Sequence, residues 1–415
     1  MNTSTNQEAS FVCLLLDELS SFGASEDGGV TRLLYTPAWL EAQLFLANRM
    51  KGIGLDVRFD RVGNLFGRLQ GKLDDAPVIM TGSHIDTVKS GGKYDGAYGI
   101  AAGIAALNQL QATYGQPDIS LEVVSFCEEE GSRFPLTYWG SGNVTGMYNW
   151  QSGGTIHDQD RVSLQEAMEV IGFGKLDQPD ARRTDIAAYV ELHIEQGPIL
   201  ERLDKQIGLV EAIVGQRRYV ITVQGDTNHA GTTPMSMRCD ALVGVAEMMV
   251  QLETDARKYG EPLVATVGRI EAWPNTPNVI AGHVQFSLDI RHPNEDMLTE
   301  FSDDALIQLN EIAEGRGLKL TTVPWLEAKP SPMSGDLTGR LERIAKELSL
   351  SSKRMVSGAG HDAQLFPAQC PTAMLFVPSQ GGCSHSPEEY TSPDELEDGV
   401  SVLTALLYEL GYEEK

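Results

Sequence analysis

The chain has 415 residues, more than one hydrophobic core usually supports, so about two domains are expected. Its 58 acidic residues outnumber its 32 basic residues and give a formal net charge of -26, which argues against a nucleic-acid partner.

Residues 1–10 hold no basic run followed by an apolar core, and no window reaches the ~18 apolar residues of a membrane span, so neither secretion nor membrane insertion is expected. Five scattered cysteines without a C-x-x-C pair are typical of reduced thiols, which predicts a cytoplasmic protein.

Short apolar runs alternate with helical patterns in the first half of the chain, and the same kinds of pattern return at its end. The predicted elements are strands at 77–81, 119–126, 187–192 and 372–377, and helices at 96–110 and 393–410. Alternating strands and helices favour a parallel sheet that is covered by helices. The sequence therefore predicts an α/β domain with a mostly parallel sheet.

The order of predicted strands and helices changes between about residues 214 and 324. The predicted order is strand 219–224, helix 239–259, strand 263–270, strand 284–290, helix 295–314 and strand 318–323. This β-α-β-β-α-β order is that of the ferredoxin-like split βαβ unit. We therefore expect a small α+β domain of residues 214–324 to be inserted into an α/β domain built from residues 1–213 and 325–415.

Four of the eight histidines follow strand-like runs or glycine-rich turns, where open α/β sheets bind their ligands. They are His84 in TGSHIDTV, His193 in VELHIEQG, His361 in GAGHDA and His385 in GGCSHSPEE. A single histidine at such a place is more often structural than functional. Four of them beside carboxylates and glycines favour a metal or catalytic site.

Carboxylates accompany these histidines at short spacings. Asp86 lies two residues after His84, so in an extended chain both side chains project from the same side and Asp86 can orient the imidazole. Glu195 follows His193 at the same spacing, and a surface hydrogen bond at a strand end is the alternative for both pairs. Asp95 in GGKYDGAYG opens a predicted helix, where it is either the helix N-cap or a metal ligand.

Three adjacent glutamates, Glu128, Glu129 and Glu130, follow the predicted strand 119–126. Adjacent carboxylates repel one another unless water or a cation neutralises them. The run is therefore either a solvated acidic loop or part of a metal cluster in which one carboxylate is a ligand and its neighbour moves protons. The spacing does not decide which glutamate has which role.

The expected inserted domain supplies cationic and amide groups. They are Gln216, Arg217 and Arg218 in GQRR, His229 in NHAGTTPM, Asn278 in PNTPNV and Arg291 in DIRHP. Arginine binds a carboxylate through two parallel hydrogen bonds, and asparagine can both donate to and accept from a urea-like group. Each residue alone is more often a surface or capping residue, but the set suits a small, anionic, amide-rich substrate.

Eight motifs follow one another over nearly the whole chain: HIDTV, GGKYDG, EEEGSRFP, ELHIEQGP, NHAGTTPM, PNTPNVI, GAGHDA and CSHSPEE. Together they resemble the amidase and carbamoylase branch of the M20 metallopeptidase clan. The resemblance implies that two divalent ions are bridged by Asp95, and that the ligands are His84, Asp95, Glu130, His193 and His385. It also implies that Glu129 is the general base.

Asp86, which orients the site, and His229, which stabilises the oxyanion, complete the expected catalytic set. The resemblance implies that the inserted domain is a lid and dimerisation domain of a homodimer. The expected substrate-binding residues are Gln216, Arg218, His229, Asn278 and Arg291. A shell of carboxylate and imidazole without cysteine suits Mn, Zn, Co or Ni, and the resemblance favours Mn.

The resemblance implies hydrolysis of a ureido C–N bond in a small carboxylated substrate. Allantoate is the favoured substrate, with ureidoglycine, ammonia and carbon dioxide as products of a step in purine degradation. Arg218 supports this substrate, because a second ureido group needs polar partners, and related carbamoylases tend to carry an aromatic residue there. N-carbamoyl-L-amino acids and N-carbamoyl-β-alanine are the alternative substrates. An aminopeptidase or deacylase of the same clan, and a non-catalytic binding protein, are the remaining alternatives.

Overall fold

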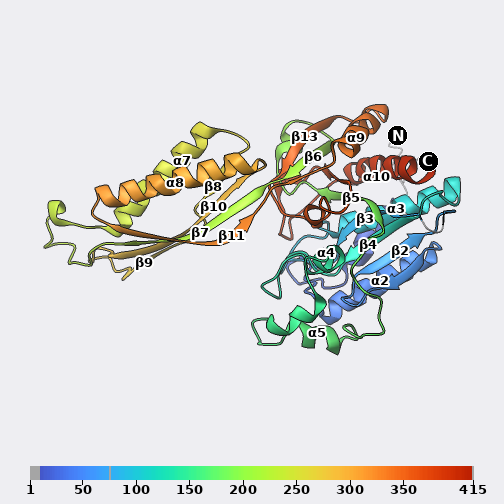
Figure 1. The fold of residues 1–415 in the computed structure, drawn as a ribbon, viewed down its shortest axis with the longest axis horizontal. Coiled ribbons are helices and arrows are strands. Elements are labelled where there is room, and N and C mark those ends of the chain that lie inside the picture. Colours follow the sequence, from blue (N-terminus) through green and yellow to red (C-terminus); the bar gives the residue numbers. More distant parts are fainter. Residues whose placement is uncertain (1–9, 74–75, 414–415) are drawn as a thin grey trace, which may run out of the picture. The chain divides into compact units, whose positions relative to one another are not determined.

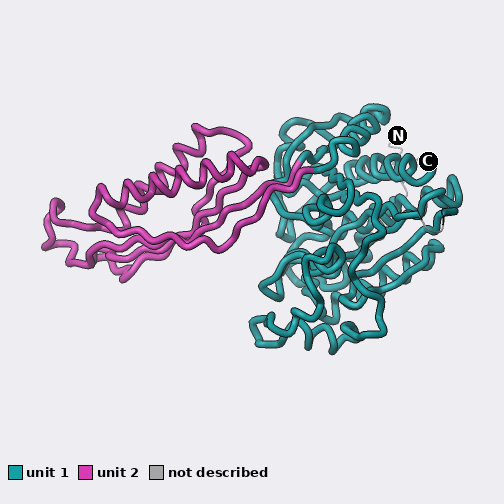
Figure 2. The backbone as a smooth tube through the Cα atoms, viewed as in Figure 1, with its two compact units in different colours: residues 1–211, 333–415 teal, residues 212–332 magenta. Residues whose placement is uncertain are grey.

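The computed structural model describes residues 10–73 and 76–413, and the chain divides into two compact units. One unit comprises residues 1–211 and 333–415, and the other comprises residues 212–332 (Figure 2). The second unit is thus an insertion in the first. These borders differ from the expected ones at 213/214 and 324/325, in part because strand β11 (Lys319–Ala328) continues beyond residue 324. No helix in the described part of the chain is long and apolar enough to cross a bilayer.

The first unit combines a nine-stranded mixed sheet with helices (Figure 1). The strands of this sheet are β1 (Asp56–Phe59), β2 (Leu65–Leu69), β3 (Val78–His84), β4 (Leu121–Phe126), β5 (Ile186–Ile194), β6 (Ile207–Ile213), β12 (Ser331–Pro332), β13 (Ser352–Ser357) and β14 (Thr372–Val377). The helices are α1 (Phe11–Ser20), α2 (Pro37–Gly52), α3 (Ala97–Tyr114), α4 (Trp139–Thr145), α5 (Leu164–Val170), α6 (Ile199–Arg202), α9 (Gly335–Glu347) and α10 (Pro393–Tyr408). Short turns of 3₁₀ or π helix are η1 (Trp150–Thr155), η3 (Asp362–Leu365), η4 (Gln380–Gly382) and η5 (Glu409–Glu413).

The centre of this sheet is parallel. Strands β4, β3, β5 and β14 are neighbours in this order and pair in parallel, and every residue of β3, β4 and β14 is buried. Burial on both faces explains the continuous apolar runs from which these strands were predicted. The flanking pairs β1–β2, β2–β4, β14–β6 and β6–β12 are antiparallel. The expected α/β class is confirmed, with the parallel pairing confined to the middle of the sheet.

Helix α3 brings its first residues to the carboxyl ends of β3 and β5. It packs against β3, β4 and β5 of the sheet and against the helices α1 and α10. Small residues permit this close packing, since a Cβ at Gly99 would overlap the side chain of Ser83 and the carbonyl of Leu192. The loop that precedes α3 is therefore held at the edge of the sheet where the strand-end histidines lie.

The second unit has the strand and helix order that the sequence predicts, except that two short strands, β8 (Val264–Thr266) and β9 (Ile270–Trp273), replace the single strand expected at 263–270. Its elements are β7 (Gly215–Gln224), η2 (Met235–Met237), α7 (Ala241–Tyr259), β8 (Val264–Thr266), β9 (Ile270–Trp273), β10 (His283–His292), α8 (Glu295–Gly315) and β11. The sheet order is β11-β7-β10-β8, with β9 also on β10, and all pairs are antiparallel. This is the ferredoxin-like arrangement, which confirms the expected inserted α+β fold.

One face of this second sheet packs on its two helices. Side chains alternate along β7 and β10 between buried and partly exposed positions. The buried set, which includes Ile221, Val223, Phe286 and Leu288, forms one core with α7 and α8. The partly exposed set lies on the other face, where Gln216, Arg218 and Arg291 were expected to bind a substrate.

Candidate metal centre

Histidines and carboxylates converge at the carboxyl ends of the parallel strands. His84 is the last residue of β3, His193 lies one residue before the end of β5, and Glu130 follows β4. Asp95 precedes α3, and His385 lies in the loop before α10. Because neighbouring parallel strands end at the same edge, residues that are far apart in the sequence meet there.

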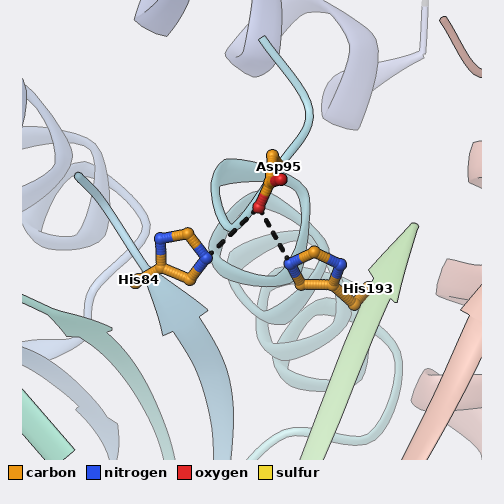
Figure 3. Close-up of side chains that lie close together, drawn as sticks. All are labelled: His84, Asp95 and His193. Carbon is orange, nitrogen blue, oxygen red and sulfur yellow. Dashed lines mark ion pairs between the residues drawn. The ribbon is translucent and has the colours of Figure 1, made fainter. Parts of the chain in front are cut away.

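Three of these residues form a first group of ligand atoms. The Nε2 atoms of His84 and His193 each lie 3.3 Å from Oδ1 of Asp95 (Figure 3). The Nδ1 atom of His84 lies 3.1 Å from the carbonyl oxygen of Asp86, and that of His193 lies 2.9 Å from the carbonyl oxygen of Ile194. A carbonyl only accepts, so Nδ1 of each ring carries a proton, and a ring that has lost its other proton presents a lone pair at Nε2. Two lone pairs and a carboxylate oxygen around one point suit a cation.

A second group shares Asp95. Its other oxygen, Oδ2, lies 3.2 Å from Nε2 of His385, which is 3.3 Å from Oε1 of Glu130. In each group the ligand atoms lie within 4.8 Å of one another. The groups differ in burial, because the His385 side chain is 48% exposed while those of His84 and His193 are 2% and 1% exposed. One carboxylate thus faces a buried and a more open set of ligands.

Asp95 is not the cap of α3. The N-cap of this helix is Gly96, and no side chain makes a capping hydrogen bond there. Gly96 has a φ of +64°, and a Cβ at this position would overlap the ring of His84. Glycine therefore allows both the turn and the close approach of the ring. The N-cap alternative for Asp95 is wrong, and its carboxylate is left to face the histidines.

The three glutamates are not a solvated loop. Glu128 is fully buried and Glu129 is 8% exposed. The carboxylate of Asp86 accepts the backbone N–H of Glu129 at 2.9 Å and that of Glu130 at 3.1 Å. The Oδ1 atom of Asp86 also lies 3.3 Å from the Nδ1 atom of His84. Its carboxylate therefore holds the turn that carries the glutamates as well as approaching the imidazole.

The charges of the site depart from their ordinary states in the metal-free protein. Burial, and then the charge of Glu130, raise the pKa of Glu129 well above its usual value. Burial acts in the same direction on Asp95, but hydrogen bonds with three histidines, His193 first, lower its pKa well below the usual value. Contacts with Asp95 and Glu130 raise the pKa of His385 to about 10. In the metal-free protein, bound protons therefore neutralise part of the negative charge of the carboxylates, and divalent cations can take the place of these protons. The carboxylate oxygens and imidazole nitrogens are donors that suit such ions.

Gln196 is a residue at this site that the sequence analysis missed. Its Nε2 donates to Oδ2 of Asp95 at 2.7 Å, and its Oε1 is buried without a hydrogen-bond partner among the described residues. The sequence feature that could have identified Gln196 is its place in the motif ELHIEQGP, directly after Glu195, which the sequence analysis considered instead. That residue, Glu195, does not orient His193. Its carboxylate instead accepts the backbone N–H groups of Ile199 and Leu200 at 2.7 and 2.8 Å, at the start of α6.

His361 lies behind the first group of ligands. Its ring centroid is 4.6 Å from that of His193, and its Nε2 is 3.0 Å from Oγ of Ser357. Burial, and then the charge of His193, lower the pKa of His361 well below its usual value. The imidazole is therefore neutral and supports the ring of His193 by packing.

Three of the expected substrate-binding residues lie together in the second unit. Gln216 and Arg218 are on the partly exposed face of β7, and Arg291 lies opposite Gln216 on β10. Asp289, which the sequence analysis missed, lies opposite Arg218. Its carboxylate is 2.8 Å from Nε of Arg218 and accepts two hydrogen bonds from Arg291, at 3.0 and 2.9 Å. Asp289 thus holds both guanidinium groups on this face.

His229 and Asn278 lie beyond the other end of the same strands. Both are exposed, and the N–H of Ala230 donates to the carbonyl of Asn278 at 2.9 Å. The rise along β7 from Arg218 to Gln224, which still precedes His229, amounts to about 20 Å. The second unit therefore divides the expected binding residues into two separate groups, which a small substrate cannot bridge.

An α/β sheet with an inserted ferredoxin-like unit, and a carboxylate shared by two sets of histidine and carboxylate ligands, define a metal-dependent hydrolase. The chain belongs to peptidase family M20/M25/M40, whose pattern matches residues 80–409. It is 51% identical to the allantoate amidohydrolase of Bacillus subtilis (strain 168) over 96% of both chains. It is 37% identical to the N-carbamoyl-L-amino-acid amidohydrolase of Pseudomonas sp. (strain NS671), covering 94% of this chain and 95% of that protein. The crystal structure of an amidase of the hydantoinase/carbamoylase family from Burkholderia multivorans is 34% identical, with a TM-score of 0.93 over 97% of this chain and 98% of that one. The predicted family is confirmed.

Proposed function

We propose that this chain hydrolyses allantoate to ureidoglycine, ammonia and carbon dioxide. The observation that carries the proposal is the higher identity to the allantoate amidohydrolase than to the carbamoyl-amino-acid amidohydrolase, at nearly equal coverage. Arg218 supports it, because a guanidinium held by Asp289 suits the second ureido group of allantoate better than an apolar side chain. The five cysteines are all free thiols, which supports a reducing, cytoplasmic compartment.

The site is proposed to hold two divalent ions, with Mn favoured. One ion is assigned to His84, Asp95 and His193, and the other to Asp95, Glu130 and His385. When bound, such ions polarise the ureido carbonyl and lower the pKa of the attacking water. The all-oxygen-and-nitrogen donor set is also compatible with Zn, Co or Ni.

Glu129 is proposed to be the general base. It is buried beside His84 of one ligand group and Glu130 of the other, which places its carboxylate to take the proton of the attacking water and to pass it to the departing nitrogen. Asp86 keeps Glu129 in place through the backbone N–H groups of the glutamate turn. His229 is assigned to the developing oxyanion, because a polarised N–H donor is what such a charge needs.

The separation of the two substrate-binding groups supports a homodimer. Arg291, with Gln216 and Arg218, is assigned to the carboxylate and ureido groups of the substrate, since a guanidinium fork matches a carboxylate. His229 and Asn278 lie about 20 Å or more from this group along the same sheet, so they serve the same substrate only from a second copy of the chain. Each site would then be completed by the partner's inserted unit.

The substrate assignment is tested by product analysis. Purified, Mn-supplemented protein is given allantoate, N-carbamoyl-β-alanine or a panel of N-carbamoyl-L-amino acids, and ammonia and urea are measured. We expect ammonia without urea from allantoate, at rates far above those of the other compounds. Faster turnover of a carbamoyl compound would move the substrate to that alternative while leaving the metal centre and the base in place.

Subunit complementation tests the shared site. Arg291→Ala and His229→Ala subunits are unfolded, mixed and refolded together. If each site takes these residues from different copies, a mixed dimer contains one site with both substitutions and one intact site, so about half of the wild-type activity per mixed dimer returns. If one copy supplies both residues, each site keeps one defect and no activity returns, which would contradict the shared site.

A further inference from the structure

Glu389 connects two loops of the metal centre. It lies four residues after His385 and is 5% exposed. Its Oε1 accepts the backbone N–H groups of Tyr94 and Asp95 at 3.0 and 3.1 Å. Its Oε2 accepts the hydroxyl of Ser384 at 2.9 Å, and that hydroxyl also lies 3.2 Å from Oδ2 of Asp95. One buried carboxylate therefore ties the turn that carries Asp95 to the loop that carries His385.

The loop of Asp95 passes directly against this carboxylate. A Cβ at Gly92 would overlap the carboxylate of Glu389, although the φ of Gly92 lies outside the left-handed region. Space, and not backbone conformation, is therefore what requires glycine there. Because Gly92 has no side chain, the carboxylate of Glu389 has room to reach the backbone N–H groups of Tyr94 and Asp95.

The two ligand groups depend on such support to different extents. His84 and His193 extend from strands in the centre of the sheet, which fixes their positions. His385 has a φ of +54° in a loop between η4 and α10, and its side chain is half exposed. Its distance from Asp95 depends on how these two loops are joined.

We propose that Glu389 is a positioning residue that sets the affinity of the ion held by Asp95, Glu130 and His385. The inference rests on the proposed two-ion centre. Groups that orient metal ligands typically contribute ~10–100-fold to metal affinity. Without the carboxylate, two buried N–H groups lose their acceptor, and the turn and the loop move apart. The ion at His84 and His193 keeps both histidines on the central strands and shares only Asp95 with the displaced turn, so the second ion, which depends on both loops, is weakened far more.

The test is a calorimetric titration of the metal-free protein with Mn²⁺. Wild type is expected to bind two ions. Glu389→Ala should weaken the second ion by about 10–100-fold and leave the first within about threefold. Glu389→Gln should restore most of the affinity, because its amide oxygen still accepts both N–H groups and its amide nitrogen can donate to Ser384. The exposed neighbour Glu388 supplies the matched control Glu388→Ala, which should bind both ions as wild type does.

Gly92→Ala is a second route to the same result, because its methyl group displaces the carboxylate without altering it. Thermal unfolding of each metal-free variant identifies any variant that fails to fold, and the remaining variant then decides. Equal weakening of both ions, or wild-type affinity in Glu389→Ala, would overturn the proposal. A wild-type protein that binds fewer than two ions would instead contradict the two-ion centre itself.

Discussion

Replacement of Asp86 by asparagine tests how the glutamate turn is held. Asp86 is 1% exposed, and its two carboxylate oxygens accept separate backbone N–H groups, from Glu129 and from Glu130. In Asp86→Asn one oxygen becomes an NH₂ group, so one of these N–H donors faces another donor. A buried donor without an acceptor costs about 1–3 kcal/mol.

The lost charge adds to this cost because Arg32 lies nearby and is fully buried. Burial lowers the pKa of Arg32 to about 10, and the negative charge of Asp86 opposes that shift. The guanidinium also donates to the carbonyl of Ile85 at 2.9 Å, so it cannot leave for water without breaking this bond. With this negative charge removed, we expect the free energy of unfolding of Asp86→Asn to fall by about 3–5 kcal/mol in total, which is the loss typical when one partner of a buried charge pair is removed.

The activity of Asp86→Asn should fall more than its stability alone explains. A displacement of Glu129 by about 1 Å is enough to cost ~100-fold in rate. We therefore expect kcat/KM of the folded variant to fall by about 100-fold, measured at saturating Mn²⁺ and well below its midpoint of thermal unfolding.

Glu195→Gln is the matched control. Glu195 also accepts two backbone N–H groups, from Ile199 and Leu200, but at the start of α6. It should lose about 1–3 kcal/mol of unfolding free energy while kcat/KM stays within about threefold. Wild-type kcat/KM in Asp86→Asn, or an equal fall in both variants, would refute the reasoning.

Three further predictions follow from the site. Glu129→Gln should lower kcat by about 10²–10⁴-fold while two metal ions per chain remain, measured by steady-state kinetics and metal analysis; an active variant would exclude Glu129 as the base. Because the pKa of metal-free His385 is about 10, this residue is protonated at pH 7 and must release its proton to bind an ion. Mn²⁺ affinity should therefore fall as pH decreases, by about tenfold per pH unit for each proton released, and calorimetry in buffers of different ionisation enthalpy counts these protons; binding without proton release would contradict the assignment. Arg291→Lys removes the guanidinium fork and should raise KM for allantoate by about tenfold or more with little change in kcat, whereas an unchanged KM would place the carboxylate elsewhere.

Much of the fold follows from local pattern. The buried strands β3, β4 and β14 appear as apolar runs because both faces of each strand are covered, and α7 and α8 appear as amphipathic helices because they cover one face of the second sheet. The strands β1, β2, β6 and β13, which lie outside the parallel centre of the sheet, were not predicted. β1 and β13 are only partly buried, whereas β2 and β6 are mostly buried, and the pairing of all four depends on neighbouring strands that a local sequence pattern does not identify.

The same division holds for the site. Positions at strand ends singled out His84 and His193, and resemblance to a family chose between the alternatives for Asp95 and for the glutamates. Gln196, Asp289 and Glu389 were missed. Each is a polar residue whose role depends on a partner far along the chain, and such a residue is indistinguishable from a surface residue in the sequence.

The sequence by itself determined the class of fold, the family and the set of residues from which a metal centre can be built, because burial and strand ends leave periodic and local signals. Only the tertiary structure decided how these residues meet: that the two oxygens of Asp95 face different histidines, that Asp289 holds both arginines, and that the substrate-binding residues form two separate groups. Distances between side chains arise when strands and loops distant in the sequence pack together, and that packing is a property of the whole fold.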